Sequence, residues 1–92
     1  MNRTELEARI AEQTGFPRAT VQKIVAAFED SVCTSLRNGG RVRLVGFGSF
    51  TVQERKERQG RNPRTGEIIT IPASRRPVFK PGKTLVERVS GQ

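Results

Sequence analysis

Apolar side chains recur at helical spacing through the first 40 residues. One stripe runs through residues 3–14, with Asn2 at capping-box distance before it and Gly15 as a stop behind it. A longer stripe runs through about residues 18–38 and ends at Asn-Gly-Gly, residues 38–40. The pattern predicts two helices joined by a tight turn, which is a helical hairpin.

Beyond residue 40 the apolar period changes from 3.6 to 2. Alternation over 41–44 and again around Phe50 predicts two half-buried strands joined by a glycine turn. Apolar content then falls over 53–76, where two extended segments flank the turn Gly60–Gly66. We expect this segment to form a long β-ribbon, called the arm below. A short helix is predicted over about 83–90.

These elements predict an α+β fold with a helical hairpin, a three-stranded antiparallel sheet, the arm and a short C-terminal helix. A single domain is expected over 1–92, with a body of 1–52 and 77–92 and an arm of about 53–76. So short a chain builds a weak core, and oligomerisation is the remaining means of support, so we expect a homodimer. The residues expected in the core or dimer contact are apolar: Val21, Ile24, Val25, Phe28, Val32, Leu36, Phe47, Phe50 and Phe79.

Composition removes whole classes of function. The 92 residues include no histidine and one cysteine, which excludes the usual general base, a Ser-His-Asp triad, an internal disulfide and a Cys/His zinc site. We therefore expect no enzymatic activity, no metal, no cofactor and no small-molecule substrate. The first residues lack the apolar centre of a signal peptide, and no apolar run is long enough for a membrane span, so we expect a cytoplasmic protein without a membrane partner.

The net charge of +8 is concentrated in the middle of the chain. Residues 1–40 carry five basic and five acidic side chains, whereas 41–83 carry eleven basic and three acidic ones. Such concentration is typical of a surface that binds phosphates. An arm of about 11 residues at roughly 3.3 Å each reaches about 36 Å, close to one turn of B-DNA. The first strand of the arm carries Arg55, Arg58 and Arg61, with Lys56 between them and Arg64 just past the tip. The return strand carries Arg75, Arg76 and, beyond the arm, Lys80. A rigid proline ring, Pro63, lies near the end of the arm. This pattern predicts that the arm binds duplex DNA and that Pro63 acts as a wedge between base pairs.

Four segments carry a family resemblance: GFGSF at 46–50, GRNPRTGE at 60–67, IPAS at 71–74 and FKPGKTL at 79–85. Together they resemble the HU/integration-host-factor family of bacterial histone-like proteins, and HU most of all. The resemblance implies a nucleoid-associated, intertwined homodimer that bends DNA through minor-groove arms, prefers bent or nicked DNA, has low sequence specificity and compacts the chromosome. It places Arg55, Arg58 and Arg61 along the arm and Asn62, Pro63 and Arg64 at its tip. Lys80, Lys83 and Arg3 would meet flanking phosphates, and the turn from Gly46 to Ser49 would bring backbone N–H groups near phosphate.

Two positions depart from the family pattern. Position 53 is commonly basic in the family and is Gln53 here, which predicts a weaker grip at the base of the arm. Pro17 stands where a capping serine is usual before the second helix.

Three other interpretations compete. Residues 10–25 imitate a helix-turn-helix, although the first 40 residues carry no net charge to bring to DNA. A small basic chain is also compatible with RNA binding, but the grooves of A-form RNA suit such an arm poorly. The stretch 81–84, Pro-Gly-Lys-Thr, resembles the end of a phosphate-binding loop but lacks the upstream glycine, so a strand-to-helix turn is the better interpretation.

Overall fold

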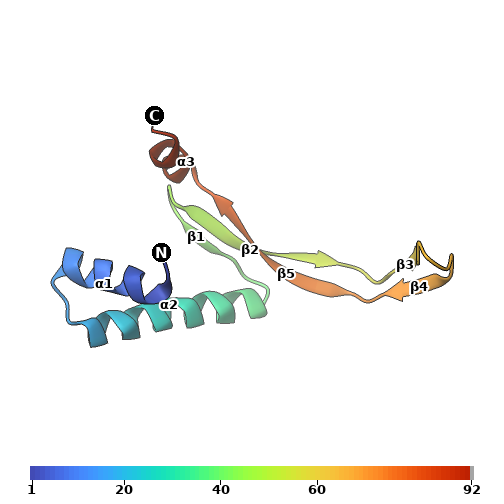
Figure 1. The fold of residues 1–92 in the computed structure, drawn as a ribbon, viewed down its shortest axis with the longest axis horizontal. Helices are drawn as coiled ribbons and strands as arrows, with labels where there is room; N and C mark the ends of the chain where they lie inside the picture. The colour runs from blue at the N-terminus through green and yellow to red at the C-terminus, as the bar shows by residue number, and fades with distance from the viewer. Residues whose placement is uncertain (92) are drawn as a thin grey trace. The chain divides into compact units, whose positions relative to one another are not determined.

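The computed structural model describes residues 1–91, which divide into two compact units, 1–35 and 36–91. The first unit holds α1 (Arg3–Thr14) and most of α2 (Arg18–Arg37). The second holds the end of α2, five strands and α3 (Lys83–Ser90). The elements follow one another in the predicted order (Figure 1).

The helical hairpin forms where the sequence predicts it, because its ends are capped locally. The side chain of Asn2 accepts a hydrogen bond of 2.8 Å from the Glu5 N–H at the start of α1. Gly15 adopts a left-handed conformation with φ 76° and donates its N–H to the carbonyl of Ala11. Pro17 provides only its carbonyl to α2, accepting the Val21 N–H at 3.1 Å.

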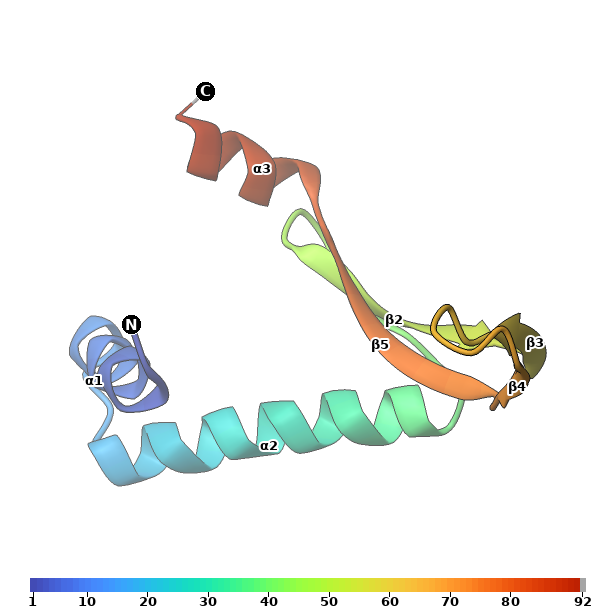
Figure 2. The ribbon, with the colours of Figure 1, turned by 45° about the vertical axis from the view of Figure 1, so that its right-hand side comes forward.

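Three strands of the second unit form an antiparallel sheet in the order β1-β2-β5. They are β1 (Val42–Leu44), β2 (Gly48–Arg55) and β5 (Ser74–Pro81). On one face of this sheet the Phe79 ring lies 4.9 Å from that of Phe50 and 5.7 Å from that of Phe47. Figure 2 shows β2 and β5 as one twisted ribbon, with α3 following the end of β5. The sheet and the terminal helix are as predicted.

The outer part of the arm is a separate two-stranded sheet of β3 (Arg58–Arg61) and β4 (Ile68–Ile71). The strand pairing is interrupted at 56–57 and 72–73, where Pro72 has no N–H to donate. Pairing nevertheless keeps one register across the interruption, from Arg55 opposite Ser74 to Arg58 opposite Ile71. The predicted long β-ribbon is therefore present with an interruption in its strand pairing, and its two faces are continuous.

Two predicted boundaries within the arm shift. Residues 53–55 and 74–76 belong to the three-stranded sheet of the body as well as to the base of the arm. Gly60, expected in the tip turn, lies within β3 opposite Ile69. A Cβ on Gly60 would lie 2.8 Å from Cδ1 of Ile71, so the glycine makes room for that side chain.

Few of the predicted core residues are buried in a single chain. Val21 and Leu36 are buried, and Val25, Val32 and Phe50 are half-buried. Four of the predicted residues, Ile24, Phe28, Phe47 and Phe79, are 52%, 44%, 48% and 39% exposed in the single chain, so for them contact within a dimer stays a prediction. The physical reason is that helix and strand periodicity identifies an apolar face but not the surface that covers it. A single chain covers only part of the apolar surface that its helices and its sheet present.

Within residues 1–91, no helix combines the length and the apolar character that a membrane crossing requires.

Candidate nucleic-acid interface

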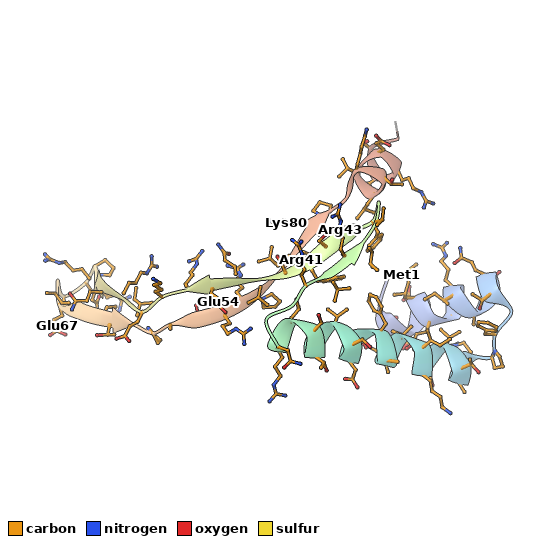
Figure 3. All side chains as sticks on the ribbon, turned by 180° about the vertical axis from the view of Figure 1, so that it is seen from behind. Met1, Arg41, Arg43, Glu54, Glu67 and Lys80 are labelled. Atoms are coloured by element: carbon orange, nitrogen blue, oxygen red, sulfur yellow. The ribbon has the colours of Figure 1, made fainter. Side chains whose placement is uncertain are left out.

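One face of the three-stranded sheet is basic and polar. The register places Arg43 opposite Ser49 and Ser49 opposite Lys80, so these three side chains form a row across the sheet. The next rows toward the arm on the same face pair Thr51 with Val78, Gln53 with Arg76, and Arg55 with Ser74. Figure 3 shows Arg43 and Lys80 on one side of the sheet and Glu54 on the other. We call this surface the basic face; its cations are Arg43, Arg55, Arg76 and Lys80.

The basic face includes a residue that the sequence analysis did not select. Arg43 alternates with Val42 and Leu44, a pattern that already indicated an outward arginine. Only the strand register shows that it lies in the same row as Lys80. The register also supplies a cation beside Gln53, because Arg76 lies directly opposite. Arg76 is thus the one cation of this pair, and the weaker grip expected from Gln53 stays a prediction.

Arg75 lies on the opposite face and is held by the body. Its guanidinium donates to the carbonyl of Leu36 at 3.0 Å and to that of Arg37 at 3.2 Å, at the end of α2. Its Nε lies 3.4 Å from a carboxylate oxygen of Glu54. A cation at a helix C-terminus satisfies carbonyls that have no partner within the helix and meets the negative end of the helix dipole. In this structure Arg75 therefore ties the base of the arm to α2.

The three arm arginines do not share one face. Arg55 and Arg61 lie on the side of the basic face, whereas Arg58, opposite Ile71, lies on the other side. Their spacing of three residues in a structure of period two produces this alternation. All three side chains are exposed. The outer ribbon therefore carries cations on both of its faces.

The tip loop, residues 62–67, is closed by its own hydrogen bonds. The Asn62 N–H donates to the Glu67 carbonyl at 2.8 Å, and the Gly66 N–H donates to the Asn62 carbonyl at 2.8 Å. The Asn62 side chain also accepts the Arg64 N–H at 2.9 Å, spanning Pro63. Gly66 has φ 72°, which a residue with a side chain adopts at a cost. These bonds fix the loop with Pro63 and Arg64 exposed near its end.

Arg3 is engaged within the helical hairpin. Its guanidinium lies 2.6 and 2.7 Å from the two carboxylate oxygens of Glu29, and its Nε lies 3.3 Å from the largely buried carboxylate of Glu7. The hydrogen bonds and charge of Glu29 raise the pKa of Arg3 above its ordinary value, and the hydrogen bond from Arg3 lowers the pKa of Glu29. Two carboxylates therefore compete with any phosphate for this side chain.

The turn that contains Gly46 is tied to the start of α3. The Gly46 carbonyl accepts the Leu85 N–H at 3.1 Å, and the Phe47 carbonyl accepts the Gly82 N–H at 2.8 Å. A Cβ on Gly82 would lie 2.7 Å from the Gly46 oxygen, so only glycine permits this approach. Lys83 begins α3 and is 89% exposed, with Nζ 3.9 Å from Glu87. The stretch 81–84 is thus a strand-to-helix turn, as interpreted from the sequence.

The predicted site residues fall into two groups. Those available on the surface are Arg55, Arg58, Arg61, Asn62, Pro63, Arg64, Arg76, Lys80 and Lys83, with Ser49 half-buried between two cations. Arg3, Arg75 and Gly46 make structural contacts within the chain. Among residues 1–91, no group of three or more potential ligands of the His, Cys, Asp and Glu types lies close enough together to hold a metal ion.

Comparison with known proteins agrees with this arrangement. Residues 1–90 match the family described as "Bacterial DNA-binding protein". The chain is 51% identical over 89 residues to the DNA-binding protein HU of Geobacillus stearothermophilus, covering 97% of this chain and 99% of that one. It is 47% identical over 92 residues to DNA-binding protein HU 1 of Bacillus subtilis, covering both chains completely.

Solved structures show the same fold. A cocrystal structure of Anabaena HU with DNA matches with a TM-score of 0.86 and 39% identity, covering 100% of both chains. HU from Thermotoga maritima matches with a TM-score of 0.68 and 30% identity, covering 97% of this chain and 98% of that one. On the strength of the full-length match and these identities, the chain belongs to the HU family of bacterial DNA-binding proteins.

Proposed function

We propose that this chain is a histone-like architectural protein of the bacterial nucleoid. As a homodimer it binds duplex DNA through its arms and the basic face, and it is not an enzyme. The observation that carries the proposal is the ribbon itself, with cations on both faces and a proline-containing loop at its end. The exposed apolar side chains of the single chain support the homodimer, because a second copy presents the same unfilled surfaces.

The arms are proposed to follow the minor groove. A ribbon lying in this groove has a phosphate strand on either side, so Arg55 and Arg61 on one face and Arg58 on the other reach both strands. Arginine suits this position because its planar fork matches phosphate oxygens and narrow minor grooves attract it. Lys80, Lys83, Arg76 and Arg43 are proposed to bind the flanking phosphates. Contacts of this kind give affinity with low sequence specificity.

The tip is proposed to bend the duplex. Hydrogen bonds within residues 62–67 hold the Pro63 ring at the end of the arm without help from the body. An apolar wedge of this type unstacks a base step at a cost of a few kcal/mol, which the bent duplex returns through added contacts. In nicked, gapped or already bent DNA, base steps are partly unstacked before the protein binds. Such DNA should therefore bind more tightly than a continuous duplex.

Pro63→Ala tests the wedge. Dye pairs at the two ends of a duplex report the bend angle by energy transfer, and a gel-shift titration reports affinity. We expect the variant to bend DNA much less while losing less in affinity, because the arginines remain. Thr65→Ala, which alters the same loop without touching the ring, is the matched control. Equal bend angles for Pro63→Ala and the parent protein would eliminate the wedge.

A comparison of duplexes tests the wider proposal. Random, A·T-rich and nicked DNA of one length, with duplex RNA as competitor, should rank nicked DNA first and RNA last. Tighter binding of duplex RNA would instead favour an RNA-binding role. Arg18→Ala should leave any sequence preference unchanged, whereas a helix-turn-helix would lose it.

A further inference from the structure

The return strand β4 contains three isoleucines that do not share one role. Ile69 and Ile71 alternate onto the same face, over Gly60. A Cβ on this glycine would lie 2.8 Å from Cδ1 of Ile71 and 3.9 Å from Cγ1 of Ile69, so the two side chains occupy the space above it. They form a small apolar contact that holds β3 and β4 together. This contact explains Ile69 and Ile71 but not Ile68.

Ile68 points to the other face of the ribbon. It lies opposite Arg61, and the next pair inward on that face is Gln59 with Thr70. Its neighbours are thus charged or polar, and the side chain is 65% exposed, more than Ile69 at 44%. An exposed β-branched apolar residue on a ribbon of two unprotected edges favours aggregation rather than stability. The β-branched shape of Ile68 suits a strand, but burial within the chain does not account for its apolar surface.

The position of Ile68 relates it to the tip. The pair Asn62 and Glu67 closes the tip loop, and Ile68 with Arg61 is the adjoining pair. The wedge residue Pro63 follows Asn62 directly. Whatever receives the tip therefore also meets Ile68. In a complex with DNA, the tip would lie in the minor groove. The walls of this groove are lined by the C–H groups of the deoxyribose rings, which are apolar.

We propose that Ile68 is a second apolar contact of each arm, packing against the sugar walls of the minor groove beside the step that Pro63 opens. This inference rests on the proposed function and adds a residue to it. The occupant is duplex DNA because the cations around Ile68 select a polyanion: Arg61 lies directly opposite and Arg64 lies in the adjoining loop. Arg61 binds the phosphate while Ile68 excludes water from the sugar beneath it. An apolar contact adds affinity that salt does not screen.

Ile68→Thr tests the proposal, because threonine keeps the β-branched shape that suits a strand and removes apolar surface. The matched control is the double variant Ile68→Thr/Thr70→Ile, which restores the composition of the face but moves the isoleucine away from the tip. A third variant, Arg61→Gln, removes the neighbouring charge. Affinity for a nicked duplex is measured by fluorescence anisotropy over a range of salt concentrations, with bend angle and thermal unfolding measured in parallel.

We expect Ile68→Thr to bind about tenfold more weakly, with an unchanged slope of log affinity against log salt. The double variant should bind as weakly as Ile68→Thr, since the proposal requires an isoleucine at position 68 and not merely one on the same face. Arg61→Gln should instead flatten the slope. Thermal unfolding of Ile68→Thr should match the parent, because the side chain is largely exposed in the free protein.

Three results would overturn the inference: parental affinity in Ile68→Thr, recovery of affinity in the double variant, or a loss of affinity that follows a loss of thermal stability. Each leaves the proposed function standing as long as the parent bends DNA and shows a steep salt dependence. A parent protein that neither bends DNA nor responds to salt would refute the proposed function itself.

Discussion

Arg61 and Arg75 have the same predicted role in the sequence and different surroundings in the structure. Among residues 1–91, no carboxylate forms an ion pair with Arg61, which lies exposed on β3. Arg75 donates to two carbonyls at the end of α2 and pairs with Glu54. Arg61→Gln and Arg75→Gln remove the same charge. We predict that Arg61→Gln lowers the salt dependence of DNA binding with little change in stability, whereas Arg75→Gln lowers stability with little change in that salt dependence.

The expected magnitudes follow from these contacts. Arg61→Gln removes one phosphate contact per protomer, so the salt slope of a homodimer should fall in size by about 1.8, at about 0.9 per phosphate. Unfolding free energy should change little. Arg75→Gln removes a cation from a helix C-terminus, where such an interaction contributes about 1 kcal/mol or less when it is partly exposed. Because its side chain is 48% exposed, the expected loss of stability is at most about 1 kcal/mol.

Two measurements separate the variants. Anisotropy titrations of a labelled duplex between about 50 and about 200 mM salt yield the slope, and urea unfolding yields the stability. Arg75→Lys serves as a control, because it keeps the charge but loses the paired geometry of the guanidinium. If Arg75→Gln flattened the slope as much as Arg61→Gln and unfolded at the parental urea concentration, Arg75 would leave the helix end for phosphate in the complex. Contact of Arg75 with DNA, predicted from the sequence, would then be correct.

Three further predictions concern the free protein. Gly82→Ala should destabilise the protein, because a Cβ there would lie 2.7 Å from the backbone oxygen of Gly46; a lower urea midpoint would show it, and the parental midpoint would contradict it. The pKa of Glu29 lies below its ordinary value of 4.5 because Arg3 bonds to it, so the stability from this pair is present above that value and is lost as pH falls through the lowered pKa. Urea unfolding of the parent and of Glu29→Gln should therefore converge in acid, and a gap that persists there would refute this assignment. Asn2→Ala should cost about 1 kcal/mol of stability by removing the cap of α1, whereas Asn2→Ser, which keeps a capping oxygen, should lose little in the same melt.

Local chemistry made much of the fold predictable. Asn2, Gly15 and the stop at Gly39 are short-range signals, and each acts in the structure on residues within four positions of itself. The tip loop is equally local, since its hydrogen bonds join residues of 62–67 to one another. Elements defined by neighbours in sequence were therefore placed within a residue or two.

What the sequence could not show depends on distant residues. The capping role of Arg75 joins positions 38 and 39 residues apart, and no pattern around Arg75 indicates the end of α2. Likewise, Arg3 and Lys83 look alike as basic residues near helix starts, yet only Arg3 meets two carboxylates. The sequence shows which residues are charged, but it does not show which of them form ion pairs within the folded chain.

The constant register of the ribbon links these local and distant features. Because successive pairs from Ser49 opposite Lys80 to Arg61 opposite Ile68 keep one alignment, every second pair stays on one side for the length of the arm. That side carries Arg55, Arg76 and Lys80, while Glu54 and its partner Arg75 stay on the other. A slip of one residue would place cations of one strand on the side that carries Glu54, and the basic face would lose them. The interruption leaves two residues unpaired on each strand, 56–57 and 72–73. Because the number is even and equal on both strands, the two faces of the ribbon stay distinct from its base to its tip.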